Sequence, residues 1–373
     1  MTTWRDWAWG ELNVVREAGR WRSPVTVDAR GPEGTLIDGT KVVSFASNDY
    51  LGLSAHPALA RAAHDAIDWW GTSSTAARLI VGSRPVHDEL EAALASWKGE
   101  ERAVLFPTGY TTNLGVLATF ARPGTLVVSD ELNHASIIDG CRLARADVAV
   151  FRHADPDHAA ALVAAHDGPT IVVTDTVFSM DGDLAPVSAL AEACARLGAL
   201  LVLDEAHQVL GDPPATGTAE VVRVGTLSKT LGALGGFAAT SAPLAELLIN
   251  RARSYIFTTA STPADAAAAL AAVGIVRSAE GDALRAELRT NVDRLVPGHP
   301  SPIVPVVVGE EAAAVAASAA LLARGILVPA IRPPTVPDGT CRLRIALSAA
   351  HTLDQVDALV EGLDACVPDW RKR

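Results

Sequence analysis

The chain has 373 residues, which at roughly 150 residues per domain predicts two or three domains with a large buried core. Apolar residues make up 49% of it and charged residues 20%, a balance that excludes a chain disordered throughout. Lys and Arg number 31 against 43 Asp and Glu, so the formal net charge is −12 and nucleic acid is not an expected partner.

The cysteines and the apolar stretches exclude further classes. The 4 cysteines lie far apart with no Cys-x-x-Cys pair, so we expect neither a zinc site nor a disulfide framework, and no metal. The N-terminal stretch is charged from Arg5 onward and lacks the apolar centre of a secretory signal. The most apolar stretch, residues 266–276, is shorter than the ~20 residues that a membrane span needs. We therefore expect a cytoplasmic globular enzyme with no membrane partner.

An N-terminal arm is predicted over residues 1–45. Residues 7–18 have a helical pattern, and residues 25–29 and 41–45 have the composition of short strands. The segment 47–53 that follows is too polar for a core strand and too short for a helix.

Residues 46–245 predict one large α/β domain. Helical patterns occur at 58–70, 86–98, 110–121 and 187–197. Short apolar runs alternate with them, at 103–106, 126–128, 148–151, 170–174, 200–203, 221–224 and 236–240. Continuous Val- and Leu-rich runs are typical of strands buried on both faces, so we expect a mostly parallel seven-stranded sheet flanked by helices.

Residues 246–373 predict a smaller α+β domain that packs with the N-terminal arm. The expected elements are a helix after Pro263, strands at 303–308, 326–331 and 342–347, a helix at 311–324 and a last helix from Thr352. Thr352 and Gln355 have the spacing of a capping box.

The first candidate for chemistry is Lys229, which lies in a polar loop of Thr, Ser and Gly after a short apolar run. It is either an ordinary surface lysine or a Schiff-base lysine beside an anion site of hydroxyls and backbone amides. Asp204 and His207 directly follow another apolar run, where α/β sheets place ligands. The combination of Asp204, His207 and Lys229 is more specific than any one of them.

Two more stretches fit the same site. Gly109 lies between an apolar run and a helical pattern, where a helix N-terminus can bind phosphate or the glycine can simply make a turn. His134 follows a further run and is either a loop residue or a stacking partner for a flat ring. A lysine, a carboxylate, a phosphate cradle and a stacking partner are together the needs of pyridoxal 5′-phosphate, which makes the α-carbon of an amino acid reactive.

From about residue 10 to residue 365 the chain resembles the α-oxoamine synthases, a family of fold-type-I pyridoxal-phosphate transferases. The motifs that carry the resemblance are residues 47–53, 133–136, 177–183, 204–207, 226–229, 331–340 and 342–344. It implies a large, mostly parallel seven-stranded sheet domain with a smaller C-terminal domain.

The resemblance implies roles around the cofactor ring. Lys229 would form the aldimine with the cofactor and move protons, and Asp204 would pair with the pyridine nitrogen. His207 and Ser179 would lie at or near the ring hydroxyl. His134 would stack on the ring and also border the substrate.

The resemblance also implies a phosphate site and a homodimer. Gly109, Tyr110 and Thr226 would serve the phosphate, and Thr259 would reach it from the neighbouring subunit. The active site would therefore lie at the subunit interface.

The substrate side is implied less directly. Arg344 would bind the amino-acid carboxylate, with Asn48 nearby. Arg342 lies two residues away, points the same way on a strand and is an alternative. Arg20 would meet the acyl substrate and Thr335 would line its channel. Arg16 and Arg22 compete with Arg20 for that role.

The stretch 331–337 favours the branch of the family that joins L-alanine to a pimeloyl thioester, carried by CoA or by acyl carrier protein. A sister reaction that uses glycine or serine with another acyl-CoA stays an alternative. A cofactor-binding transcription module would need a basic DNA-binding region, and a nicotinamide dehydrogenase would need a Gly-x-Gly-x-x-Gly after a strand; we find neither.

Two stretches depart from the family pattern. The family often has a glycine-rich stretch near residues 71–78, where this chain has only Gly71 and, further on, Gly82. The loop after His207, residues 208–215, is shorter than usual. We expect altered substrate access with the cofactor residues intact.

Overall fold

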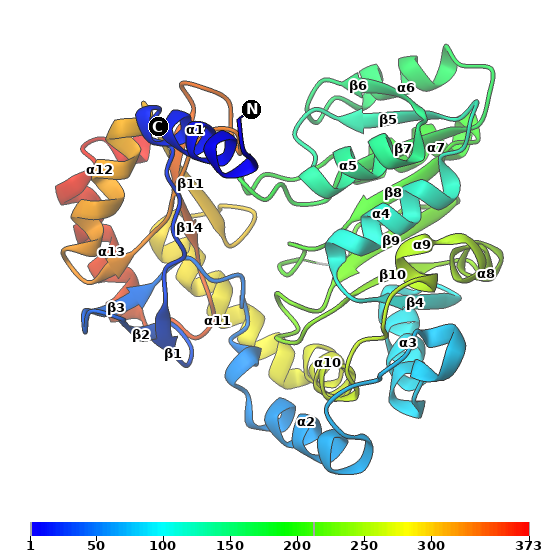
Figure 1. Ribbon diagram of the computed structural model, residues 1–373, viewed down its shortest axis with the longest axis horizontal. Coiled ribbons are helices and arrows are strands. Elements are labelled where there is room, and N and C mark those ends of the chain that lie inside the picture. The colour runs from blue at the N-terminus through cyan, green and yellow to red at the C-terminus, as the bar shows by residue number, and fades with distance from the viewer. Residues whose placement is uncertain (1, 212, 373) are drawn as a thin grey trace.

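The computed structural model describes residues 2–211 and 213–372, so Asp212 of the loop after His207 lies outside the described residues. The chain forms two bodies side by side (Figure 1). One holds a seven-stranded sheet, and the other holds a four-stranded and a three-stranded sheet.

The large sheet confirms the predicted fold class. Its strand order is β4-β10-β9-β8-β7-β5-β6. Strand β10 runs in the direction opposite to the other six strands. The strands are β4 (Arg102–Phe106), β5 (Leu126–Asp130), β6 (Asp147–Phe151), β7 (Thr170–Asp175), β8 (Leu200–Asp204), β9 (Val221–Thr226) and β10 (Gly236–Thr240). Each of the seven predicted runs lies inside one of them.

Helices cover both faces of this sheet because both faces are apolar. Neighbouring residues of a strand point to opposite faces. In β5, Val127 packs with one helical layer and Val128 with the other, and in β8 the same holds for Val202 and Leu201. The first layer is α4 (Gly109–Phe120), α5 (Ala135–Ala144) and α8 (Ala242–Arg251). The second layer is α6 (Pro156–Ala164) and α7 (Val187–Leu197).

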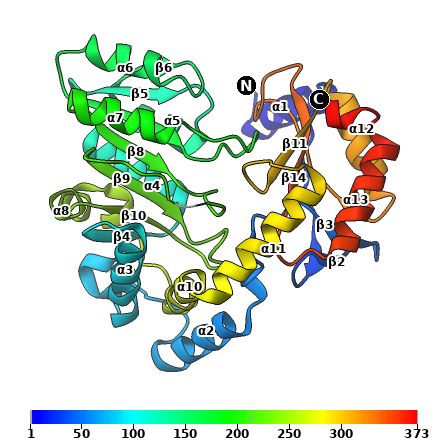
Figure 2. The ribbon, with the colours of Figure 1, turned by 180° about the vertical axis from the view of Figure 1, so that it is seen from behind.

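A third group of helices lies at the β4 end of the sheet and reaches toward the other body (Figure 2). Helix α10 (Pro263–Val276) packs against α2 (Pro57–Trp70) and α3 (Pro85–Lys98). Short helical turns lie at Leu53–Ala55, next to α2, and at Arg78–Gly82. A further short helix, α9 (Arg253–Ile256), packs with α4 and α8.

The second body joins the two ends of the chain. Strands β1 (Val27–Ala29), β2 (Glu33–Leu36) and β3 (Lys41–Ser44) pair with β12 (Ile326–Leu327), so the arm and the C-terminal part share one sheet. The three-stranded sheet is β11 (Ile303–Gly309), β14 (Cys341–Ala346) and β13 (Ala330–Ile331). Its helices are α11 (Ala279–Leu295), α12 (Glu311–Leu322) and α13 (Leu353–Cys366), and a last turn spans Trp370–Lys372.

The structure differs from the sequence prediction at several elements. The predicted strand 326–331 is two short strands in two different sheets, because the chain turns between Leu327 and Ala330. Helices α5, α6, α8 and α11 and strand β2 were not predicted. The first three helices are only nine or ten residues long, and α11 is mostly polar, so each gives a weak signal in the sequence. Thr352 caps α13 with Gln355, as predicted.

Helix α1 (Trp4–Glu17) has no buried residue. Trp4, Trp7 and Trp9 are all exposed on it. Among the described helices, none combines the length and the apolar character that crossing a bilayer requires.

Candidate active site

A cavity of about 210 Å³ lies where β7, β8 and β9 end and α4 begins. Fifteen residues line it: Thr108, Gly109, Tyr110, Asn113, His134, Ser136, Asp175, Ser179, Asp204, Ala206, His207, Gly225, Thr226, Ser228 and Lys229. The structure therefore brings eight of the predicted site residues into one cavity. This is the edge at which parallel sheets place their ligands.

A chain of polar contacts runs from Lys229 to Arg344. The amine Nζ of Lys229 lies 3.0 Å from Nε2 of His207, and Nδ1 of His207 lies 2.6 Å from the hydroxyl of Tyr50. That hydroxyl also lies 3.0 Å from Oδ1 of Asn48, which accepts a hydrogen bond from the guanidinium of Arg344 at 3.1 Å. The loop 47–53 thus connects the lysine with the arginine.

Burial sets the protonation states along this chain. It lowers the pKa of Lys229, although Asp204 and Asp175 oppose the shift, and the neutral amine is favoured relative to an exposed lysine. Burial and the nearby Lys229 charge lower the pKa of His207 well below its ordinary value, so His207 is neutral. Burial raises the pKa of Tyr50 to about 12, so its hydroxyl keeps its proton.

Asp204 is held rigidly at the end of β8. Its Oδ2 accepts a hydrogen bond from the amide of Asn113 at 2.7 Å, and its Oδ1 accepts one from the backbone N–H of Ala206 at 3.0 Å. The same Asn113 amide donates to Ser136 at 2.8 Å, whose hydroxyl lies 2.8 Å from Nδ1 of His134. One network therefore orients the carboxylate and the imidazole that the sequence assigned to the cofactor ring.

Asp175 is a second carboxyl group at the same edge, which the sequence analysis missed. It ends β7 directly opposite Asp204 in the pairing of β7 with β8. Its side chain is buried, and Oδ2 has no hydrogen-bond partner among the described residues. Burial and the neighbouring Asp204 charge raise the pKa of Asp175 well above its ordinary value.

The opposite end of the cavity is a helix N-terminus flanked by hydroxyls. Gly109 begins α4, and the hydroxyls of Thr226 and Ser228 lie 2.8 Å apart in the same cavity. A Cβ at Gly236 would lie 2.5 Å from the backbone N of Gly109, so this strand approaches the helix start only because it has glycine there. Free backbone N–H groups and hydroxyls are the usual ligands of a phosphate group.

Two arginines reach the loop after β7 from the three-stranded sheet. Arg344 donates from Nε to the carbonyl of Ser179, in addition to its bond with Asn48. Arg342 forms an ion pair with Asp181. Arg344 therefore has no carboxylate partner among the described residues, whereas Arg342 has one, which favours Arg344 as the carboxylate-binding residue.

Three predicted residues lie away from this cavity. Thr259 is exposed beside a small hollow lined by Arg78 and Tyr255. Thr335 is also exposed. Arg20 pairs with Glu311 at 3.4 Å and Asp338 at 3.2 Å on the second body. Tyr110 lines the cavity but is half exposed, and its hydroxyl donates to Asp139.

Sequence reasoning missed Tyr50, Asn113, Ser136, Asp175 and Ser228 as individual site residues. Asp175 had the same signal as Asp204, a carboxylate at the end of an apolar run. Asn113 lies one helical turn after Gly109, so a polar side chain on the first turns of that helix was the signal. Tyr50 had no such signal, because its partners His207 and Asn48 meet only in the folded chain.

The donor set fits pyridoxal 5′-phosphate. The cavity offers a buried amine with a lowered pKa, a fixed carboxylate, an imidazole and a helix N-terminus with two hydroxyls. Asn113 Oδ1 and Asp175 Oδ2 are buried there without partners in the described chain, as polar atoms that border a ligand are.

The chain is similar to known proteins over almost its whole length. The model of the family "Aminotransferase class I and II" matches residues 40–363. The 8-amino-7-oxononanoate synthase of Anaeromyxobacter dehalogenans strain 2CP-1 is 47% identical, covering 98% of this chain and 96% of that protein. The synthase of the same name from Geobacter sulfurreducens is 44% identical, covering 95% of this chain and 96% of that protein.

Solved structures share the fold. The serine palmitoyltransferase of S. paucimobilis with bound PLP–myriocin aldimine has a TM-score of 0.91 at 27% identity, covering 99% of this chain and 98% of that one. The 8-amino-7-oxononanoate synthase of Francisella tularensis has a TM-score of 0.73 at 26% identity, covering 87% and 97%. Pyridoxal 5′-phosphate is the cofactor of this fold family. The chain therefore belongs to the class I and II aminotransferase family, and within it to the 8-amino-7-oxononanoate synthases.

Proposed function

We propose that the chain catalyses the decarboxylative condensation of L-alanine with a pimeloyl thioester. The products are 8-amino-7-oxononanoate, CO₂ and the free carrier, a step of biotin biosynthesis. The observation that carries the proposal is the chain of contacts that joins the buried amine of Lys229 to Arg344 through His207, Tyr50 and Asn48. Such a site holds a base and a carboxylate-binding group at the two ends of one small substrate.

The cofactor contacts follow from the cavity. When bound, pyridoxal 5′-phosphate supplies a ring that stabilises negative charge at the α-carbon of an amino acid. In this proposal Lys229 bonds to it and Asp204 pairs with its ring nitrogen. His134, His207 and Ser179 contact the ring and its hydroxyl.

Lys229 moves the proton at the α-carbon of the substrate. Burial lowers the pKa of Lys229 and so favours its neutral amine, which is the basic form that can accept this proton. His207 lies 3.0 Å from the amine and is neutral, so its ring nitrogen can accept a hydrogen bond from the ammonium form. The pair therefore holds the proton until it is returned to the product.

Arg344 binds the carboxylate of L-alanine. A planar guanidinium suits a carboxylate because two parallel hydrogen bonds can form. Arg344 is 5% exposed and donates to Ser179 and Asn48, which fixes its plane. The carboxylate that it orients is the group that leaves as CO₂.

The phosphate and acyl sides are assigned by the family resemblance. Gly109, Tyr110 and Thr226 serve the phosphate, and Thr259 reaches it from the partner in a homodimer, which agrees with its exposed position in the single chain. Arg20 and Thr335 border the pimeloyl group. Both lie on the second body, and the arm carries Arg20.

We also propose the division of the chain into an arm (1–45), a cofactor-binding domain (46–245) and a C-terminal domain (246–373). The pairing of β3 with β12 supports the packing of the arm with the C-terminal domain. Helix α10 shows that contacts nevertheless cross the second boundary, since it packs on α2 and α3.

The test is a matrix of substrates with the purified, cofactor-loaded chain. L-Alanine, glycine and L-serine are each combined with pimeloyl-CoA, pimeloyl-acyl carrier protein, acetyl-CoA and palmitoyl-CoA, and products are identified by mass spectrometry. We expect kcat/KM for L-alanine with a pimeloyl thioester to exceed the kcat/KM for glycine or L-serine by at least about tenfold. This is the discrimination that one methyl or hydroxyl group allows.

Two outcomes would contradict the proposal. A preference for serine with palmitoyl-CoA would make the chain a sister enzyme with the chemistry of its structural neighbour. No condensation with any pair, in a chain that retains its cofactor through gel filtration, would remove the assigned reaction altogether. The pimeloyl-CoA and carrier-protein arms separately identify the acyl donor.

A further inference from the structure

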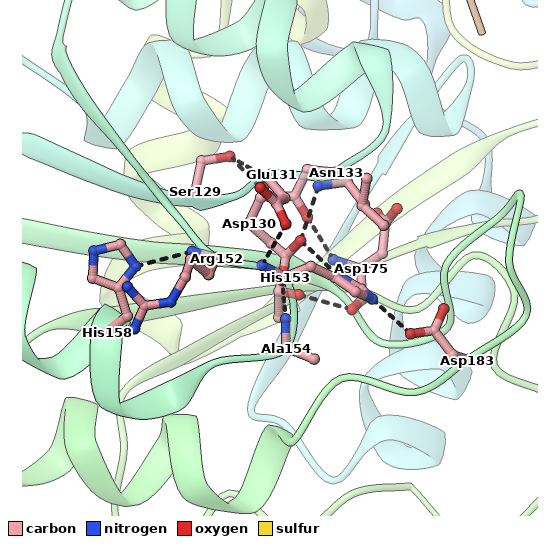
Figure 3. Close-up of polar contacts among 12 residues, drawn as sticks. Ser129, Asp130, Glu131, Asn133, Arg152, His153, Ala154, His158, Asp175 and Asp183 are labelled. Carbon is pink, nitrogen blue, oxygen red and sulfur yellow. Dashed lines mark hydrogen bonds and ion pairs between the residues drawn. The ribbon is translucent and has the colours of Figure 1, made fainter. Parts of the chain in front are cut away.

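A histidine outside the cavity is held between two carboxylates. Nδ1 of His153 lies 3.0 Å from Oδ1 of Asp130, and Nε2 lies 2.6 Å from Oδ2 of Asp183 (Figure 3). The ring also packs edge-on against Phe178, with centroids 4.4 Å apart. An imidazole can donate to two ionised carboxylates at once only when it is protonated, so this geometry favours the charged ring.

The two carboxylates are held very differently. Asp130 ends β5, its side chain is 1% exposed, and it also accepts hydrogen bonds from the backbone N–H groups of Leu132 and Ala154, both at 2.9 Å. The side chain of Asp183 is 43% exposed, and among the described residues its side-chain partner is His153. If the ring loses its charge, Asp130 keeps the one remaining N–H and Asp183 is released into water.

Asp183 belongs to a small hairpin, residues 177–184, that spans the two bodies of the molecule. The backbone N–H of Phe178 donates to the carbonyl of Asp183 at 3.0 Å, and that of Gly182 donates to the carbonyl of Phe178 at 2.8 Å. Gly182 has φ +72°, and a Cβ there would lie 1.9 Å from the carbonyl oxygen of Ile303. The hairpin tip therefore packs directly on β11 of the second body.

The hairpin also carries the contacts of the substrate arginine. The carbonyl of Ser179 accepts from Arg344, and Asp181 pairs with Arg342. His153 fixes one leg of this hairpin to the large sheet, and the arginines fix its tip to the three-stranded sheet. A change at His153 therefore acts on the orientation of Arg344 through a covalently continuous loop.

We propose that His153 is a positioning residue for the amino-acid site, whose charged ring clamps the 177–184 hairpin and so keeps Arg344 in its carboxylate-binding orientation. The proposal rests on the assignment of Arg344 under the proposed function. It predicts that affinity for the amino acid falls when the ring of His153 is neutral, whether by pH or by substitution.

The surroundings of His153 favour the charged ring. Burial opposes the charge, but the hydrogen bonds to Asp130 and Asp183 outweigh it and raise the pKa of His153. The other charged or titratable groups around it are Glu131, which accepts from the backbone N–H of His153, and Arg152, Asp155 and His158 on the side of α6. Because the folded pKa is raised, the clamp is complete at low pH and is lost as pH rises through that pKa.

The decisive experiment measures hydrogen exchange of residues 176–185 in the cofactor-loaded chain from pH 6 to pH 9, corrected for intrinsic exchange, by mass spectrometry. His153→Gln offers one donor nitrogen and one acceptor atom, as the neutral ring does, and carries no charge. Asp183→Asn removes the charge from the other partner. His158→Gln is the matched control, because that ring lies in the same region and accepts a hydrogen bond from the backbone N–H of Arg152. KM and kcat for L-alanine are measured in parallel.

In the unsubstituted chain, protection of the hairpin from hydrogen exchange should fall about tenfold as the pH rises, because one charge-assisted hydrogen bond is lost. His153→Gln and Asp183→Asn should show the low protection at every pH and a KM for L-alanine several times higher, with kcat within about twofold. His158→Gln should match the unsubstituted chain.

Protection that is independent of pH in the unsubstituted chain, or unchanged in both variants, would overturn the proposal. Exchange needs no substrate, so its result stands even if L-alanine proves to be the wrong amino acid. Lost hairpin protection with an unchanged KM would show that the clamp does not reach Arg344, and would also overturn it.

Discussion

The two sheets that border the site present their functional side chains in opposite ways. The seven-stranded sheet places Asp175, Asp204 and Thr226 at the last positions of β7, β8 and β9. The three-stranded sheet places Arg342 and Arg344 inside β14, on one face of the strand. The large sheet therefore presents these groups at one edge, whereas the small antiparallel sheet presents its two arginines on a face.

This difference matters for charge. Carboxylates at a strand end lie beside loop N–H groups, and Asp204 has such a partner in Ala206. The strand-centre arginines are 5–6% exposed and need partners from elsewhere in the chain, which the 177–184 hairpin supplies. The carboxylates at the strand ends therefore have partners nearby in the sequence. The partners of the two arginines depend on how the two bodies pack together.

The largest expected effect is at the edge of the large sheet. Lys229→Ala should lower kcat at least about a thousandfold, because Lys229 is the one lysine among the described residues that line the cavity. Product formation from L-alanine and pimeloyl-CoA measures it. Lys41→Ala changes an exposed lysine of β3 and should leave the rate unchanged; an equal loss in both variants would remove the special role of Lys229.

A pair of substitutions on β14 sharpens the comparison. Arg344→Met should raise KM for L-alanine about 100-fold, the value of a bidentate charge-assisted contact. Arg342→Met should raise it less than about fivefold, since Asp181 is one-third exposed and returns to water. Steady-state kinetics of both variants decide between the two arginines, and the reverse ranking would transfer the carboxylate to Arg342.

Tyr50→Phe tests the connection between the two regions. It removes the hydroxyl between His207 and Asn48 but keeps the buried ring. We expect KM for L-alanine to rise about tenfold, the cost of leaving buried polar groups without a partner. An unchanged KM with normal folding by circular dichroism would show that the lysine and the arginine act independently.

Asp175→Asn tests stability at the sheet edge. The pKa of Asp175 is raised in the folded chain. The free energy of unfolding of the chain therefore falls as the pH rises above the pKa of the unfolded aspartyl group, about 3.8. The amide has no such penalty, so the variant should gain about 1 kcal/mol in free energy of unfolding at pH 8 and almost nothing at pH 4. Urea denaturation at both pH values measures it, and a loss of stability at pH 8 would show that Asp175 is ionised.

The sequence predicted the groups at the strand ends of the large sheet far better than the contacts of the arginines on β14. Strands β4 to β10 were found because each is a continuous apolar run, and Asp204, His207 and Lys229 were found because they follow such runs. Arg344 came from a family motif rather than from a pattern. Its contacts with Asn48 and Ser179 join residues 296 and 165 positions apart, which no window of sequence contains.

The contacts of His153 with the two carboxylates were missed for the same reason. Residues 130, 153 and 183 meet because β5, β6 and the hairpin after β7 are neighbours in space. Helices α5, α6 and α8 were missed because each is only nine or ten residues long, which leaves few turns in which a helical pattern can be recognised.

Helix α1 has a consequence for how the protein can be observed. Of the eight tryptophans in the chain, Trp4, Trp7, Trp9 and Trp21 lie in the arm, and each is at least 42% exposed. Much of the intrinsic fluorescence therefore comes from indole rings in water on the segment that carries Arg20. Anything that covers the arm, whether a second chain or an acyl substrate, should shift that emission to shorter wavelength, so the molecule contains its own optical reporter of arm contacts.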